Sequence, residues 1–389
     1  MSPKRSRLFK TCLVIPLGAV GLLVLITAIL DLTNIGLPQH SLTIDHLSEL
    51  EKARLAEVIH LRKSLGDDVW PGWSQADIPL IVYNEQYVFL VGYPDPPAGW
   101  KKVPSMEQRG GTWEIVPADT FEGQPYYRTE LTDRDKTPQG FTVLVGDRWV
   151  ATFMTREYGQ VNFYQDFRKN FPPVISDLIP VRLVWAFLMG KSESYIAALE
   201  HESFHSLEGM LALNTFNASE EMYSVEANYP YDAMDDPWKQ EMNVLVDAAQ
   251  AATDAEARDL ANQFLQLRTE RHKGLTTEEI RLEQLREWEE GLAKYAELKI
   301  MRQADAKHDY LPIESMAQDK DFKYYKNQQR FWTQQLEQAA SVGGLSGDTR
   351  FYYSGNAIAV LLDRLMPGWK PRALPGGEYL DDLLQVAVE

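Results

Sequence analysis

Residues 195–209, YIAALEHESFHSLEG, contain two histidines and an apolar pattern that together indicate a helix with a chemically distinctive face. His201 and His205 are four residues apart, so on a helix their imidazoles lie on one face, one turn from each other. The rest of such a helix would carry an apolar stripe made of Ile196, Leu199, Phe204, Leu207 and Leu211. We therefore expect a helix over residues 192–212 that packs against a core.

The two histidines have the spacing of a metal site. Both imidazoles can reach one ion, and Glu202, which follows His201 directly, would lie beside the open position of that ion. There it could take a proton from water and pass it to a leaving amine. The chain has a single cysteine, Cys12, so a further ligand downstream must be His, Asp or Glu.

Two later segments extend this pattern. Residues 286–297 read REWEEGLAKYAE on a strongly helical stretch, and residues 351–355 read FYYSG at the start of another helical run. Together with HExxH, and in this order over residues 195–365, they resemble the gluzincin metallopeptidases, the thermolysin and aminopeptidase N type of fold. The resemblance covers the helical half of the chain.

The resemblance implies a role for each segment. It implies Zn²⁺ held by His201, His205 and Glu290, because Glu290 matches the third-ligand position of the family's E-G-x-A-x-Y-x-E-like segment. It implies Glu202 as general base and then general acid. Tyr352, which matches the Y-x-x-G tyrosine, would hydrogen-bond the oxyanion of the reaction.

The chain departs from the family pattern in two places. The gap from His205 to Glu290 is 85 residues, which requires an inserted helical pair, and the G-x-M-E-N element that holds a substrate N-terminus is missing. Glu226 has the shorter, thermolysin-like spacing and remains an alternative third ligand, as do its neighbours Glu220 and Glu221. Glu297 is either a partner that orients a ligand or a solvated helix charge.

Charge and composition exclude several classes of protein. The 389 residues include 56 acids and 39 bases, and four of those bases precede residue 11, so residues 11–389 carry 56 acids against 35 bases. This net charge of −21 has the wrong sign for tracking a phosphate backbone, and we expect no nucleic-acid partner. A single cysteine excludes a disulfide framework and a cysteine-rich zinc fold.

The N-terminus has the pattern of a membrane anchor. Residues 11–30, TCLVIPLGAVGLLVLITAIL, contain no charge and would form a helix of about 30 Å, enough to cross a bilayer. The basic residues before it predict residues 1–10 as a cytoplasmic tail, with the bulk of the chain periplasmic or extracellular. The predicted partner of this segment is the lipid bilayer, and a cleaved signal peptide is the alternative.

The remainder divides by composition. Residues 31–74 are expected to form a linker and an amphipathic helix, with the helix over residues 41–65. Residues 75–170 contain β-branched and aromatic runs separated by Pro, Gly and Asp, which predict a β-rich subdomain with a small, mainly antiparallel sheet. Residues 171–389 are mostly helical and are the expected zinc-peptidase domain. The predicted fold class is therefore α+β, with a transmembrane helix, a small β region and a thermolysin/aminopeptidase-like zinc domain.

Further helices are expected after the HExxH segment. Their patterns fall at residues 235–272, 277–304, 321–340 and 357–365. Residues 178–189, LIPVRLVWAFLM, are unusually apolar and are expected in the core, with membrane-surface contact as a lesser alternative.

These patterns together predict a membrane-anchored, zinc-dependent metallopeptidase that hydrolyses a peptide or protein substrate outside the cytoplasm. The resemblance also implies an edge strand along which an extended peptide lies. One alternative is a non-catalytic anchored binding or assembly protein with a degenerate or structural HExxH site. Another is a zinc amidase that acts on a non-peptide substrate. Cleavage specificity and oligomeric state cannot be read from the residues.

Overall fold

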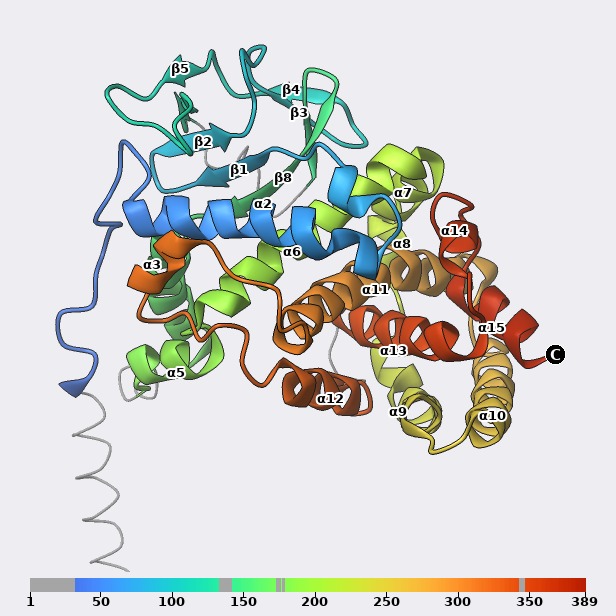
Figure 1. Cartoon of the computed structure of the whole chain (residues 1–389). Helices are drawn as coiled ribbons and strands as arrows, with labels where there is room; N and C mark the ends of the chain where they lie inside the picture. The colour runs from blue at the N-terminus through green and yellow to red at the C-terminus, as the bar shows by residue number, and fades with distance from the viewer. Residues whose placement is uncertain (1–31, 133–141, 173–175, 177–178, 343–346) are drawn as a thin grey trace, which may run out of the picture.

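The structure is a computed structural model that describes all residues except 1–31, 133–141, 173–175, 177–178 and 343–346. Figure 1 shows a β-sheet on one side of two long helices, α2 and α6, with most of the remaining helices on the other side. The HExxH segment lies on α6, so the sheet and the helical part meet along the element that carries the two histidines.

The described residues form one eight-stranded sheet in the order β4-β3-β7-β8-β1-β2-β6-β5. All neighbouring strands are antiparallel except β1 and β8, which run parallel. The strands are β1 (Leu80–Tyr83), β2 (Tyr87–Val91), β3 (Trp100–Lys102), β4 (Glu107–Arg109), β5 (Glu114–Ile115), β6 (Tyr127–Glu130), β7 (Val143–Val145) and β8 (Arg148–Met154).

The prediction of a small β region was wrong. The two edge strands, β4 and β5, have three and two residues and are largely exposed, so they are too short to show the apolar alternation by which strands are recognised in a sequence. The central strands are buried on both faces. Alternate residues of β1 point to opposite sides, with Leu80 and Val82 in the core shared with the helices, and Ile81 and Tyr83 in a separate apolar cluster on the other face.

The helical elements follow the chain in this order. Before the HExxH helix lie α2 (Glu49–Val69), η1 (Trp73–Gln75), α3 (Arg156–Asp166), η3 (Phe167–Asn170) and α5 (Val181–Leu188). The site region contains α6 (Ser192–Leu211), α7 (Leu213–Glu220), α8 (Tyr223–Glu226), α9 (Tyr231–Gln250), α10 (Asp254–His272) and α11 (Thr277–Ala306). The chain then forms η4 (Glu314–Gln318), α12 (Gln328–Gln338), α13 (Thr349–Leu365), α14 (Lys370–Ala373) and α15 (Leu380–Val388).

The predicted membrane span needs correction. Residues 11–30 lie outside the described residues, and no helix in the described part of the chain combines the length and apolar character that crossing a bilayer requires. The very apolar α5 has eight residues, about 12 Å of helix against the roughly 30 Å of a bilayer core. The structure therefore gives no support to the predicted transmembrane architecture or to the predicted single-pass, periplasmic or extracellular location.

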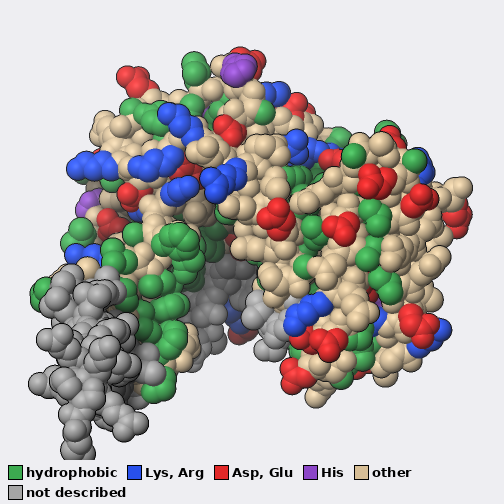
Figure 2. Space-filling model, turned by 90° about the horizontal axis from the view of Figure 1, so that it is seen from below, with side chains coloured by type: hydrophobic (Ala, Val, Ile, Leu, Met, Phe, Trp, Pro, Cys, Tyr) green, Lys and Arg blue, Asp and Glu red, His purple; other side chains and the backbone are tan. Residues whose placement is uncertain are grey.

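The apolar segment over residues 178–189 also differs from its prediction. Of α5, Val181 and Trp185 are buried, whereas Leu183, Phe187 and Leu188 are exposed by 46%, 88% and 52%. Figure 2 shows apolar side chains gathered on the face of the molecule where α5 lies. This segment therefore contributes one buried face to the core and leaves the other uncovered.

Two helix predictions changed at their boundaries. The pattern over 235–272 forms two antiparallel helices, α9 and α10, because the chain turns at residues 251–253 and Thr253 caps α10 by accepting a hydrogen bond from the Glu256 amide. The predicted helix over 321–340 is shorter, since regular structure begins at Gln328. The α9–α10 pair is the helical insertion that the long interval before Glu290 required.

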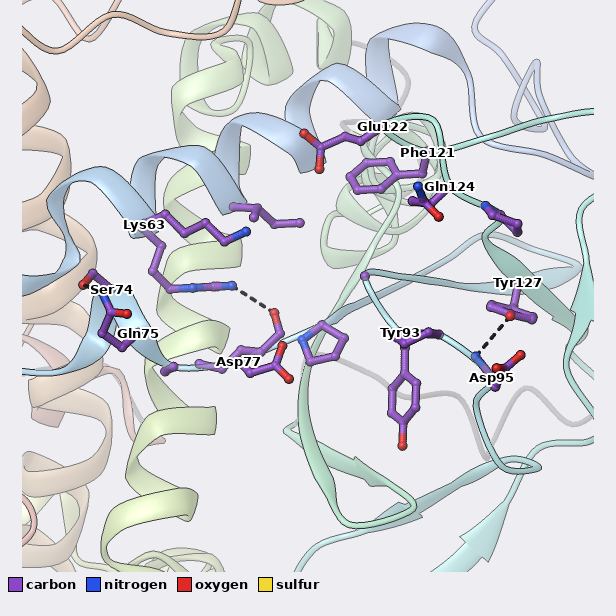
Figure 3. A pocket seen from close by; sticks show the side chains of 18 residues that line it. Lys63, Ser74, Gln75, Asp77, Tyr93, Asp95, Phe121, Glu122, Gln124 and Tyr127 are labelled. Atoms are coloured by element: carbon purple, nitrogen blue, oxygen red, sulfur yellow. Dashed lines mark hydrogen bonds between the residues drawn. The ribbon is translucent and has the colours of Figure 1, made fainter.

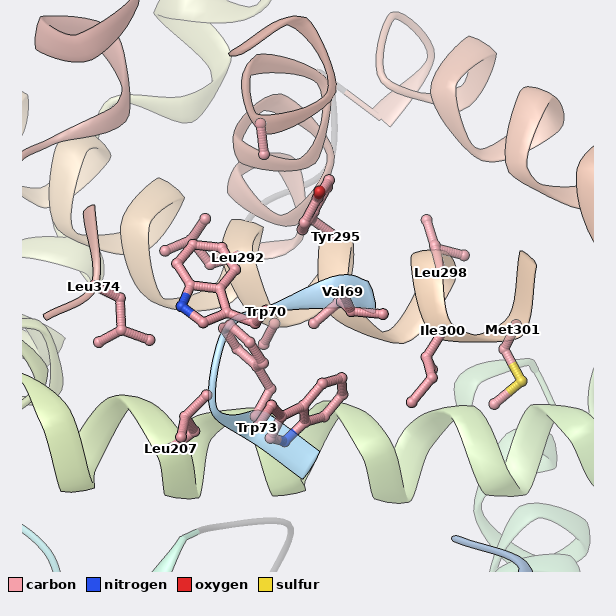
Figure 4. Packing of buried hydrophobic residues seen from close by; sticks show 14 of the residues in the cluster. Val69, Trp70, Trp73, Leu207, Leu292, Tyr295, Leu298, Ile300, Met301 and Leu374 are labelled. Atoms are coloured by element: carbon pink, nitrogen blue, oxygen red, sulfur yellow. The ribbon is translucent and has the colours of Figure 1, made fainter. Parts of the chain in front are cut away.

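A wedge of aromatic residues connects the helices that build the site. Trp70 and Trp73, at the end of α2, lie between α6 and α11 (Figure 4). Their ring centroids are 5.3 and 5.2 Å from that of Phe204 on α6, and Trp70 also contacts Tyr295 on α11. Both tryptophans are almost fully buried. These aromatic contacts fix the position of α6 relative to α11.

Candidate metal centre

Helix α6 presents the two histidines side by side. The helix runs from Ser192 to Leu211, close to the predicted span, and both His201 and His205 are buried. Their Nε2 atoms are 3.0 Å apart, with the ring planes nearly perpendicular. The i, i+4 spacing therefore brings one nitrogen of each ring to the same point, as the sequence predicts.

Helix α11 brings Glu290 to that point. Its Oε2 lies 3.2 Å from the Nε2 of His201 and 3.2 Å from the Nε2 of His205. One ligand atom from each of the three residues lies within 4.8 Å of the others, which makes them a possible metal-binding triad. Helix α11 begins with a capping box between Thr276 and Glu279, so its start is fixed locally, while its packing against α6 places Glu290.

Helix α13 reaches the triad because two glycines let it approach α11 closely. A Cβ on Gly291 would lie 2.5 Å from the Cα of Gly355, and a Cβ on Gly355 would lie 2.4 Å from the carbonyl oxygen of Glu287. One turn before Gly355, Tyr352 stacks on His201 with a centroid distance of 5.4 Å and an interplanar angle of 2°. Its hydroxyl hydrogen-bonds Glu290.

Two further carboxylates contact the outer nitrogens of the histidines. Glu297 Oε2 is 3.0 Å from His201 Nδ1, and Glu208 Oε2 is 2.7 Å from His205 Nδ1. Contacts of this kind fix the ring orientation and leave Nε2 free to bind a metal. The sequence suggests Glu297 as a residue that orients a histidine ligand, but it does not single out Glu208. The available signal was its position three residues after His205, on the same face of α6.

The alternative third ligands are not part of the triad. Glu226 is in the short helix α8, where its Oε2 is 3.1 Å from Arg286 Nη2. Glu220 accepts a hydrogen bond from the Tyr223 hydroxyl and lies 4.0 Å from Arg286 Nη1, while Glu221 is exposed. Among the described residues, the metal-ligand geometry found around the histidines includes Glu290 and none of these three acids.

The charges of the centre depend strongly on burial. Burial opposes a charged imidazole, but the contacts with Glu290 and Glu297 outweigh it and raise the pKa of His201 to about 9. Despite its burial, the two imidazoles hold the pKa of Glu290 well below its usual range. Burial raises the pKa of Glu202 to about 7. Burial and the nearby Glu290 carboxylate raise the pKa of the Tyr352 hydroxyl, so it stays protonated.

A cavity of about 260 Å³ opens beside the triad. Glu202, His205, Glu290 and Tyr352 all line it. Thr142, which precedes β7, also lines it, and the Thr142 hydroxyl donates a hydrogen bond to the Glu202 carbonyl. Strand β7 is an interior strand of the sheet, and the edge strands β4 and β5 contribute no residue to the cavity lining. The expected edge strand for a peptide is therefore not found among the described strands at this cavity.

A second cavity, of about 850 Å³, is separate from the triad. Figure 3 shows it between α2, with Lys63 on its wall, and the segments that carry Tyr93, Phe121 and Tyr127, the last of which begins β6. Arg62, also on its wall, donates hydrogen bonds to Ser203 Oγ on α6 and to the carbonyl of Ile78. These bonds tie the sheet to the back of α6, away from the histidine face.

The triad fits a tetrahedral metal ion. Metal–ligand distances of about 2.0–2.2 Å in tetrahedral geometry require ligand atoms about 3.3 Å apart, and the three separations here are 3.0, 3.2 and 3.2 Å. Glu202 Oε2 is buried beside the triad without a hydrogen-bond partner. Two imidazoles, one carboxylate and a free carboxylate nearby form a donor set typical of a hydrolytic zinc site.

Comparison with known proteins gives no match: no family model, no curated protein and no solved structure is significantly similar to this chain. The candidate site therefore has to be interpreted from its own chemistry.

Proposed function

We propose that this chain is a zinc-dependent metallopeptidase that hydrolyses peptide bonds with an activated water molecule. The observation that carries the proposal is the convergence of His201, His205 and Glu290, with Glu202 beside them on the wall of a cavity. Carboxylate and imidazole ligands with an adjacent free carboxylate suit hydrolysis better than a closed structural site, in which protein ligands fill every position.

Zinc, when bound, polarises a carbonyl oxygen and acidifies a water molecule. The remaining chemistry falls to the protein. Glu202, with its unpartnered Oε2, is the base that removes a proton from the water and later delivers it to the leaving amine. A carboxyl whose pKa is raised by burial to about 7 is suited to both steps near neutral pH.

Tyr352 supplies the second polar contact. Its hydroxyl is held beside Glu290 and its ring lies flat against His201, so the donor is fixed before a substrate arrives. Because the hydroxyl stays protonated, it can donate a hydrogen bond to the oxygen that gains negative charge during attack. Glu208 and Glu297 keep the two imidazoles turned with Nε2 toward the triad.

The first test is the metal content of the purified full chain and of two matched variants. The chain should contain one zinc ion, Glu290→Ala should lose most of it, and Glu226→Ala should retain it because Glu226 pairs with Arg286 and not with the histidines. Zinc retained in Glu290→Ala, or no affinity for zinc in the native chain, would refute the assigned triad.

The second test separates metal binding from catalysis. Glu202→Gln should bind zinc as the native chain does but should lose hydrolysis of a mixed peptide library by at least about 100-fold, the usual contribution of a positioned acid–base group. Mass spectrometry of the digest would identify the cleaved bonds. A library left intact by the zinc-loaded native chain would instead favour a structural site or a non-peptide amide substrate.

A further inference from the structure

The cavity beside the triad contains more acid than the proposed catalysis uses. Its walls carry five carboxylates, and the single guanidinium there is Arg286. Glu202 and Glu290 belong to the proposed reaction. The other three acids are Glu220, Glu289 and Asp348, from α7, α11 and the start of α13. With all five carboxyls ionised, Arg286 and a divalent cation at the triad would leave a formal excess of two negative charges.

Arg286 cannot neutralise these acids because it is shared. Its guanidinium is 2.8 Å from Glu289, 3.1 Å from Glu226 and 4.0 Å from Glu220, so one positive charge faces three carboxylates. Asp348 lines the same cavity, and Arg286 is the cation whose charge acts on it. Glu220 is 9% exposed, and an acid held in such a place without a full partner is costly.

The same cavity also contains a buried carboxylate oxygen without a partner. Glu202 lines it and is about nine-tenths buried, and its Oε2 has no hydrogen-bond partner. Buried polar atoms are normally satisfied, so this one indicates a group that is supplied from outside the chain. The carboxylates of Glu220 and Asp348 line the same cavity as Glu202.

We propose that Glu220 and Asp348 bind a cationic group of the substrate, so that the enzyme selects peptides with an ammonium or guanidinium group next to the scissile bond. The proposal rests on the peptidase function above and names its substrate class. The cation has two possible sources, a Lys or Arg side chain or the free N-terminus of the peptide. Both present the same charge and hydrogen-bond donors to a carboxylate.

The test measures binding apart from hydrolysis. Zinc-loaded full-length Glu202→Gln is titrated calorimetrically with Ala-Lys-Ala and with Ala-norleucine-Ala, which lacks the ammonium group, each with a free and an acetylated N-terminus. A side-chain cation would make the lysine peptide bind about tenfold more tightly. An N-terminal cation would instead make acetylation weaken both peptides by a similar factor. Either result supports the proposal.

Matched variants locate the effect. Added to the Glu202→Gln chain, Glu220→Gln and Asp348→Asn should each remove most of the preference for the charged peptide while leaving the affinity for its neutral counterpart. Glu221→Gln, the exposed neighbour of Glu220, should leave the preference unchanged. Equal binding of charged and neutral peptides, binding of none of them, or a preference that survives both substitutions would overturn the proposal.

The results distinguish a failure of the proposed peptidase function from a failure of the cation preference. If the charged peptides bind preferentially but the native zinc-loaded chain cleaves neither them nor longer lysine-containing peptides, the peptidase function fails and the cation site stands. If neutral and acidic peptides are cleaved as fast as basic ones, the peptidase function stands and the cation preference fails.

Discussion

Glu208 contacts His205 Nδ1 at 2.7 Å and is itself fully buried. A carboxylate in this place selects the tautomer that leaves Nε2 free and raises the basicity of the ring. We predict that Glu208→Ala weakens zinc affinity about 10- to 100-fold, as is usual for such partners. Competition with a chromophoric chelator measures this, and the exposed Glu221→Ala is the control. An unchanged affinity in Glu208→Ala would show that His205 is oriented by packing alone.

Tyr352 and Tyr353 form a natural matched pair. Tyr352 lies on the cavity wall, whereas the Tyr353 hydroxyl is 3.1 Å from Gln338 on α12. We predict that Tyr352→Phe lowers kcat about 100-fold with zinc content and KM nearly unchanged, because the hydroxyl acts on charge that develops during the reaction. Tyr353→Phe should retain kcat. Steady-state kinetics on a cleaved library peptide decides the assignment, and a rise in KM alone would place Tyr352 in ground-state binding.

At the scale of elements, the crossing of α11 and α13 depends on Gly291 and Gly355. An added methyl group would meet backbone atoms of the opposite helix, which cannot rotate away as a side chain can. We predict that Gly291→Ala lowers the free energy of unfolding by about 1–3 kcal/mol, the usual cost of overpacking, and also reduces hydrolysis by displacing Tyr352.

Urea denaturation and the hydrolysis rate measure the two effects. The exposed Arg281→Ala on the same helix is the control and should change neither. Full stability and activity in Gly291→Ala would mean that α13 has room to move without losing the tyrosine.

At the scale of elements, the long interval between His205 and Glu290 still allows Glu290 to reach the histidines. Helices α9 and α10 pack on each other and return the chain to α11. Two arginines of α10 hold them there through buried ion pairs: Arg268 with Glu241 and Glu287, and Arg271 with Glu241 and Glu283. These ion pairs therefore hold α9 and α10 against α11, the helix that carries Glu290.

For the whole molecule, this buried network predicts a specific pH dependence. Burial opposes the charge on Glu283, but Arg271 and then His272 outweigh it and hold the pKa of Glu283 below its ordinary value of 4.5. Its stabilisation is therefore complete above about pH 4.5 and declines as the pH falls through the lower folded-state pKa, because the unfolded chain binds the proton more readily.

We predict that Glu283→Gln lowers the free energy of unfolding by about 3–5 kcal/mol at pH 7, since it leaves a buried arginine short of a partner. The difference from the native chain should shrink at pH 3. Urea denaturation at both pH values provides the measurement, with the exposed Glu278→Gln as control. An equal difference at pH 7 and pH 3 would show that Glu283 contributes through packing and not through its charge.

The sheet and the exposed face of α5 show where sequence patterns failed at this scale. The strands β4 and β5 join the sheet through backbone hydrogen bonds to a neighbour, and with three and two residues they are too short to carry a periodic signal. Arg182 is the one charged residue in the pattern over 178–189, and a single charge did not separate the buried Val181 and Trp185 from the exposed Phe187.

By itself, the sequence determined what depends on local geometry. The helix around 201–205 and the shared direction of its two imidazoles follow from the rise and turn of an α-helix, and they hold whatever packs around them. The tertiary structure decided which distant groups meet that helix. Glu290 reaches the histidines because α11 packs on α6, and Tyr352 follows because two glycines allow α13 to cross closely. The resemblance of residues 286–297 and 351–355 named Glu290 and Tyr352 as candidates. The contacts themselves depend on core packing between segments far apart in the chain, which spacing along the sequence does not specify.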